Sequence, residues 1–81
     1  MKIINTLTLS EGQTGLELKD FTTEKEKEEF FKWAKECDIE KYVNLDGFYR
    51  ADFAGDIDYP AIQIVKGAPK KTITLCLLKW S

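Results

Sequence analysis

Few residues of this chain are suited to chemistry, and histidine, the side chain best matched to proton transfer near neutral pH, is absent. Without histidine the usual nucleophile and base triads cannot be assembled. The serines are Ser10, in a turn-forming stretch, and Ser81, the last residue, and neither has the sequence surroundings of a nucleophile. We therefore predict that the chain is not an enzyme.

The two cysteines are predicted to be reduced packing residues. Cys37 lies near the end of an expected helix, where the helix dipole disfavours a thiolate. Cys76 lies within an expected strand, and a disulfide between the two would form only if the helix end lay over that strand. A structural zinc site needs three or four nitrogen or sulfur ligands, which two distant cysteines cannot supply.

Oxygen ligands for a metal are also sparse. Asp52, Asp56 and Asp58 could offer carboxylates to Ca²⁺ or Mg²⁺, but the twelve-residue calcium loop with its closing glutamate is absent. No glycine-rich pattern of the kind that cradles phosphate occurs. The sequence therefore predicts no metal and no cofactor.

Charge is unevenly distributed along the chain, although the net charge is only −2. Between Asp20 and Asp58 twelve acidic residues face six basic ones, whereas the end of the chain carries four lysines and no acid. Arg50 is the single arginine among twelve basic residues. Because arginine makes most bidentate contacts to guanine, nucleic acid is not expected as a partner.

One candidate binding surface is acidic. Glu24 and Glu28 belong to the expected helix, and Asp56, Asp58 and Tyr59 belong to an expected loop. The alternative is that these charges merely form a solvated surface.

A second candidate surface is basic. Lys66, Lys70 and Lys71 lie in an expected turn and could join Trp80 as a platform for single-stranded nucleic acid or another ligand. The simpler alternative is a soluble hairpin tip next to a partly buried tryptophan.

The first half of the chain predicts two strands and one helix. Residues 2–9 alternate between apolar and polar, and a turn then leads into a short strand at Leu16–Lys19, so the two should form a hairpin. Thr23 and Glu26 have the spacing of a capping box, which starts a helix that runs to Cys37. An apolar stripe on that helix should pack on the sheet; it comprises Phe30, Trp33, Ala34 and Cys37.

The second half predicts three further strands. An ambiguous stretch over Asp38–Asp46 precedes them, and we interpret it as a helix end or short extra turn followed by a loop. The resulting fold class is α+β with the order β-β-α-β-β-β, in which about five mainly antiparallel strands carry one helix on one face. The expected segments are a strand at Phe48–Ala54, a loop at Gly55–Pro60, a strand at Ala61–Val65, a basic turn at Lys66–Lys71 and a strand at Thr72–Trp80.

This arrangement predicts an uncovered apolar face. If the last segment is a strand, Leu78 and Trp80 point away from the helix, and Ile4 and Val65 can join them. Such a patch would be larger than a monomer usually exposes, so it is a third candidate interface. The alternative is that a bent sheet or the loop around Tyr59 covers it.

Together these features predict a single domain over residues 1–81 that is cytoplasmic and does not span a membrane. We expect it to bind another protein, as an inhibitor or adaptor that occupies a partner surface, and a phage-type inhibitor of a host defence system fits this description. The alternatives are a nucleic-acid-binding or ligand-binding module that uses the basic turn, and a homo-oligomer such as a homodimer.

Overall fold

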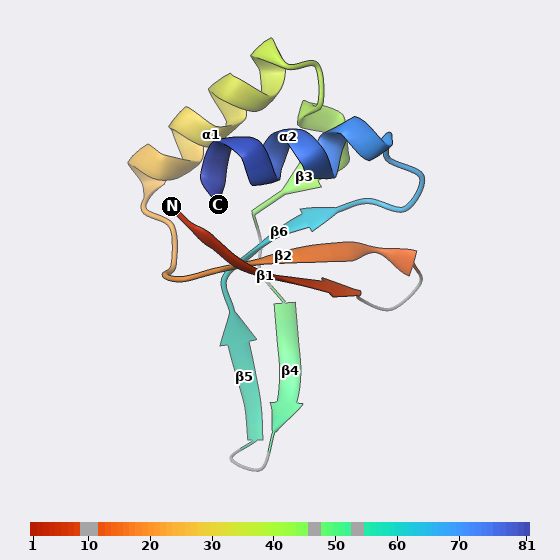
Figure 1. Ribbon diagram of the computed structural model, residues 1–81. Helices are drawn as coiled ribbons and strands as arrows, with labels where there is room; N and C mark the ends of the chain where they lie inside the picture. The colour runs from red at the N-terminus through yellow and green to blue at the C-terminus, as the bar shows by residue number, and fades with distance from the viewer. Residues whose placement is uncertain (9–11, 46–47, 53–54) are drawn as a thin grey trace.

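Figure 1 shows the computed structural model of the chain, which describes residues 1–8, 12–45, 48–52 and 55–81. These residues form an α+β fold with a four-stranded antiparallel sheet, a separate two-stranded ribbon and two α-helices. The predicted fold class is confirmed, but the predicted five-stranded sheet with one helix differs in detail. In chain order the elements are β1 (Ile3–Thr8), β2 (Thr14–Leu18), α1 (Glu24–Glu36), the 3₁₀-helix η2 (Glu40–Tyr42), β3 (Val43–Asn44), β4 (Phe48–Asp52), β5 (Gly55–Tyr59), β6 (Ala61–Ile64) and α2 (Lys70–Trp80).

The four-stranded sheet has the order β1-β2-β6-β3, and each strand runs antiparallel to its neighbours. The hairpin predicted from the first two strands is confirmed, with Thr8 opposite Thr14. Gly12, in the connection between them, has a φ of 78°, which glycine adopts at no steric cost. Strand β6 enters between β2 and β3, so the chain returns to the middle of the sheet after it has formed the ribbon.

One face of this sheet is apolar and the other carries polar residues. Successive strand residues alternate between faces, and the rows that pack against the helices are buried. On the opposite face of the sheet, Asn5 pairs with Glu17 and Asn44 pairs with Gln63. The sheet therefore has one apolar side to cover. Its buried residues are Ile3, Leu16, Leu18, Val43, Ile62 and Ile64.

Helix α1 begins at the capping box that the sequence predicts. The Thr23 hydroxyl accepts a hydrogen bond from the Glu26 amide at 3.1 Å, and the Thr23 amide donates to the Glu26 carboxylate at 3.1 Å. The amino group of Met1 lies 2.8 Å from the other Glu26 oxygen. Hydrogen bonds from this amino group and then from the Thr23 amide lower the pKa of the Glu26 carboxyl.

The predicted apolar stripe of α1 packs as expected. Phe30 and Ala34 have no exposed surface, while Trp33 and Cys37 are partly buried against the same core. Cys37 is the C-terminal cap of the helix, so both predicted ends of this element are confirmed.

The prediction of a strand at Thr72–Trp80 is wrong, because this segment belongs to helix α2. Residues four apart share one side of a helix, and this spacing puts Thr72, Cys76 and Trp80 in a single line. Thr72 and Cys76 are fully buried and Trp80 is partly buried. The β-branched residues at the start of the segment favour a strand locally, but burial against the sheet overrides that preference.

The predicted basic hairpin turn is wrong for the same reason. Residues 66–69 connect β6 to α2, and Gly67 has a φ of 85° within this connection. The strand predicted at Ala61–Val65 is confirmed as β6, which ends one residue earlier.

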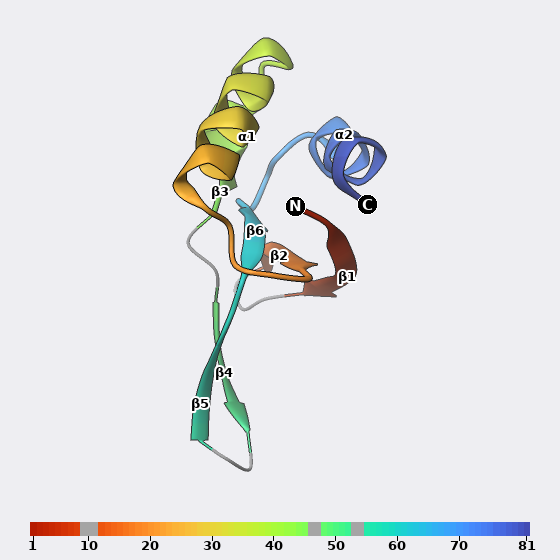
Figure 2. The ribbon, with the colours of Figure 1, turned by 90° about the vertical axis from the view of Figure 1, so that its left-hand side faces the viewer.

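Both helices lie on the same side of the sheet (Figures 1 and 2). Aromatic rings join them: the ring centroids of Trp80 and Phe30 are 6.1 Å apart, and those of Trp80 and Trp33 are 5.7 Å apart with the rings nearly perpendicular. Such edge-to-face pairs add to the free energy that area burial alone supplies. The second helix thus covers the part of the apolar face that α1 leaves open.

Between α1 and β6 the structure holds more strand than the sequence predicts. The ambiguous stretch Asp38–Asp46 contains η2 and the short strand β3, and the loop predicted at Gly55–Pro60 is mostly strand β5. The strand predicted at Phe48–Ala54 is confirmed as β4 over its first five residues. Residues 9–11, 46–47 and 53–54, which include predicted turns and strand ends, lie outside the described residues.

The molecule is elongated, at 40 × 28 × 18 Å. In both ribbon views the helices and the two chain ends lie on one side of the sheet, and the β4–β5 ribbon extends away on the other.

Replacing Thr23 by alanine is expected to lower the free energy of unfolding by about 1 kcal/mol, because the cap of α1 loses its acceptor. Urea denaturation measures the change. Thr8→Ala, an exposed position on β1, is the control and should change the value by less than about 0.5 kcal/mol. An equal loss of unfolding free energy in both variants would contradict the prediction, because the cap would then contribute no more than an ordinary exposed threonine.

Replacing Thr72 by valine is expected to stabilise the protein by about 1 kcal/mol. Among the described residues the buried Thr72 hydroxyl has no hydrogen-bond partner, and valine has nearly the same shape without the polar atom. The matched control is Thr74→Val on the exposed side of α2, where the hydroxyl faces the Lys70 carbonyl. A destabilised Thr72→Val variant would contradict the prediction.

Candidate functional site

The β4–β5 ribbon stands outside the sheet and is the first part of the candidate site. Phe48 pairs with Tyr59 at its base, and Asp52 pairs with Gly55 at its far end. In the described part of the chain neither strand pairs with β1, β2, β3 or β6. The ribbon therefore offers two open strand edges beyond the body of the molecule (Figure 1).

A two-stranded ribbon alone is marginally stable in water, so its attachment matters. Leu45, just before the ribbon, is buried in the core. Pro60, just after it, accepts a hydrogen bond through its carbonyl from the Leu18 amide at 2.9 Å. Both ends are thus fixed to the sheet, while in the described part of the chain the strands between them pair with each other and with no strand of the sheet.

The sequence of the ribbon is acidic. Strands β4 and β5 carry three aspartates and one arginine. In the register of the ribbon Asp56 is opposite Ala51 and Asp58 is opposite Tyr49, two positions apart on β5. Two of the predicted acidic site residues therefore lie on the element that projects furthest from the core.

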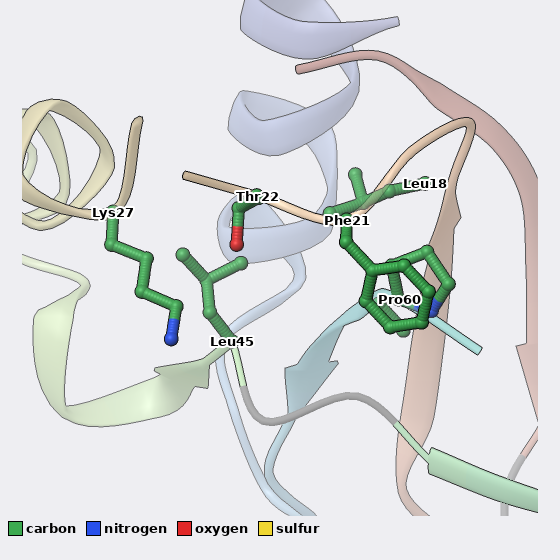
Figure 3. Close-up of a pocket in the computed structure, with 7 residues that line it drawn as sticks. Leu18, Phe21, Thr22, Lys27, Leu45 and Pro60 are labelled. Carbon is green, nitrogen blue, oxygen red and sulfur yellow. The ribbon is translucent and has the colours of Figure 1, made fainter. Parts of the chain in front are cut away.

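A cleft at the base of the ribbon is the second part of the candidate site (Figure 3). Its volume is about 200 Å³. Its lining mixes polar and apolar groups from the sheet, from α1 and from the residues that flank the ribbon, and the ring of Phe21 lies at the rim with 67% of the residue exposed. The lining residues are Leu18, Phe21, Thr22, Lys27, Leu45, Pro60 and Ala61.

Lys27 contributes the one charged side chain of this lining. Its ammonium lies 3.8 Å from a carboxylate oxygen of Glu24, one turn earlier on α1. Because both groups are exposed, the pair adds little stability. Lys27 therefore brings a positive charge as well as its alkyl stem to the edge of the cleft.

The predicted acidic surface is divided by the fold. Glu24 and Glu28 are exposed on α1, on the helix side of the sheet, whereas Asp56 and Asp58 belong to the ribbon on the other side (Figures 1 and 2). Tyr59, at the base of the ribbon, is half-buried. The five predicted residues therefore do not form one continuous surface.

The predicted apolar interface is not assembled as the strand prediction required. Trp80 packs on Phe30 and Trp33, although Ile4, Val65 and Leu78 are exposed. Ile4 lies near the start of β1 and Val65 follows the end of β6. Ile3, at the start of β1, and Pro60, just before β6, both lie beside Leu18, so these two strands start at the same end of the sheet. Ile4 therefore lies at that end, and Val65 lies at the opposite end.

The predicted basic surface is also separated. Lys66, Lys70 and Lys71 are exposed around the start of α2, and Trp80 is at its end. Ten residues of helix span about 15 Å. The lysine that does lie over the Trp80 ring is Lys79, at 5.4 Å from the centroid.

The sequence did not single out the residues that line the cleft. Phe21 has a signal that could have identified it: a large aromatic residue between Asp20 and the capping box, outside both the strand alternation and the helical stripe. Leu45 and Pro60 carry no such signal, because only the tertiary fold brings the two ends of the ribbon beside Phe21.

Reactive chemistry finds little support in the described residues. Cys37 and Cys76 are free, and no group of three histidine, cysteine, aspartate or glutamate side chains there is placed to hold a metal. Burial, and secondarily the neighbouring Cys37, raises the pKa of the Cys76 thiol to about 12. Cys76 therefore remains a neutral packing residue at ordinary pH.

No family model, curated protein or solved structure matches this chain. Within the part of the chain that the structure describes, neither helix combines the length and the apolar character needed to cross a membrane.

Thiol reactivity at pH 8 should distinguish the two cysteines. In the folded protein we expect a thiol-reactive aromatic disulfide to modify Cys37, which is partly exposed, while Cys76 reacts only after unfolding in denaturant. The released chromophore counts the modified thiols, and Cys37→Ser should abolish the reaction of the folded protein. Modification of both thiols at one rate without denaturant would refute the assignment.

Proposed function

We propose that this chain is a protein-binding module, an inhibitor or adaptor that works by placing the β4–β5 ribbon on a basic surface of its partner. The observation that carries the proposal is the position of the ribbon: it projects from the body, and the core residues that the structure describes all come from other segments. A two-stranded ribbon is marginally stable by itself in water, so it gains stability when a partner covers it.

The open edges of the ribbon support this proposal. A partner strand can add to either edge, where main-chain hydrogen bonds provide affinity and alternate side chains provide specificity. The four-stranded sheet also has two edges, the two-residue β3 and the six-residue β1, but in the described part of the chain the ribbon is the strand pair that extends away from the body.

The charge of the ribbon suggests what kind of surface it meets. Three aspartates against one arginine on its strands favour a basic partner surface and speed its association with this chain. A groove that binds nucleic acid is one such surface, and an acidic ribbon placed in it would compete with phosphates. An inhibitor of the phage type, directed at a host defence protein, would act in this way.

Charge reversal on the ribbon tests the proposal. The variant Asp56→Lys with Asp58→Lys should lose its partner in affinity capture from the source cells, because the ribbon then repels a basic surface. The matched control is Glu24→Lys with Glu28→Lys, which changes the net charge equally but lies on α1. The control should retain the partner.

The opposite pattern, in which only the α1 variant loses its partner, would assign binding to the helix. If both variants retain every captured protein, the proposal is wrong. Circular dichroism of each variant verifies that the fold is retained before capture is compared.

A further inference from the structure

We infer that two asparagines, Asn5 and Asn44, close the outer edges of the four-stranded sheet, and that Asn5 keeps β1 from pairing with β1 of a second copy of this chain. Each asparagine accepts a hydrogen bond from the outward amide of the residue that follows it. The inference concerns the body of the molecule and is independent of the function proposed for the ribbon.

The amide of Thr6 lies at the open edge of β1. Along an antiparallel strand, successive residues direct their amide and carbonyl groups to opposite neighbours. Leu18 donates its amide to the Pro60 carbonyl at 2.9 Å, on the β6 side of β2. Glu17, one residue earlier, therefore directs its backbone towards β1, where it is opposite Asn5. Thr6 directs its amide the other way, to a side on which the described part of the chain has no strand.

Asn5 supplies the acceptor that this amide would otherwise lack. Its side-chain oxygen, Oδ1, accepts a hydrogen bond from the Thr6 amide at 2.9 Å. Unpaired amides on an edge strand are the template on which another strand pairs. A strand that adds to β1 must first break the contact between Asn5 and Thr6, so its net gain in hydrogen bonds is smaller.

Strand β3 repeats this arrangement at the opposite edge of the sheet. Val65 donates its amide to the Tyr42 carbonyl at 3.0 Å, on the β3 side of β6. Gln63 directs its backbone to the same side, where it is opposite Asn44. The next amide along the chain, that of Leu45, donates to the Asn44 Oδ1 atom at 2.8 Å. The same contact at both edges indicates that it serves the edges of the sheet.

The strand that Asn5 excludes is β1 of a second copy. Charged residues and proline commonly protect long edges, and Ile3–Thr8 contains neither. The register shift between Ile3 and Asn5 disturbs only the start of the strand. Two β1 strands in a symmetric antiparallel pair would place no like charges opposite each other. The contact between Asn5 and Thr6 is therefore the protection in the middle of this edge.

Amide hydrogen exchange of the full-length ¹⁵N-labelled chain tests the contact, with each rate expressed relative to an unstructured peptide of the same sequence. Asn5→Ala should raise the exchange rate of the Thr6 amide about fivefold, because its acceptor is lost. Asn5→Asp retains an acceptor oxygen and should keep that rate low. The Thr8 amide is the internal reference, and its rate should be unchanged in both variants.

Sedimentation velocity over a series of protein concentrations tests what the contact excludes. A symmetric pair opens one contact in each copy, so removing both should lower the dissociation constant of the dimer by the square of the single effect, about 25-fold. Asn5→Ala should then self-associate at concentrations where the parent chain remains monomeric. The matched control is Thr8→Ala, an exposed position on the same strand, which should behave as the parent chain does.

Because Asn5 is exposed, its substitution should leave the fold intact, and circular dichroism verifies this. An unchanged exchange rate of the Thr6 amide in Asn5→Ala would overturn the inference at its first step. Self-association equal to that of the parent chain, including none in either, would overturn the exclusion of a second copy. Both outcomes leave the function proposed for the ribbon standing.

Discussion

The rest of this structure depends on a single constraint, the need to cover one apolar face of a four-stranded sheet. The buried rows of β1, β2, β6 and β3 form that face, and the rows on the opposite side place Asn5 by Glu17 and Asn44 by Gln63. Helix α1, with thirteen residues, is too narrow to cover the whole apolar face alone. Helix α2 covers the remainder, and the perpendicular contact between Trp33 and Trp80 fixes the two helices to each other.

The same constraint explains why the ribbon is free to project. Since β6 occupies the centre of the sheet, the chain between β3 and β6 leaves the body at Leu45 and returns at Pro60. Both helices are already engaged on the apolar face, and neither is available to cover the ribbon. The exposed Phe21 and the cleft beside it are placed where this excursion begins and ends. The core and the candidate site are thus consequences of one topology.

The parts of the fold that were predictable from the sequence are those fixed by local chemistry. The capping box of Thr23 and Glu26 and the alternation in β1 determine their elements almost alone. Thr72–Trp80 was misassigned because its apolar residues satisfy both periods: Ile73, Leu75 and Leu77 alternate as in a strand, while Cys76 and Trp80 have the spacing of one side of a helix. The segment folds as a helix because α1 leaves part of the apolar face of the sheet uncovered. Strand β5 was missed because its aspartates and glycine are typical of loops. The cleft could not be predicted because its lining comes from four separate segments of the chain.

The position of the chain ends has a practical consequence. Met1 is held to the first turn of α1 by its ion pair with Glu26, and the last residue follows α2, so both ends emerge on the helix side while the ribbon points the opposite way. Anything joined to either end, such as a fluorophore, an affinity handle or a solid support, would be carried on the helix side of the sheet, remote from the far end of the ribbon. The molecule can therefore be immobilised or labelled through its termini with its acidic ribbon presented outward to solution.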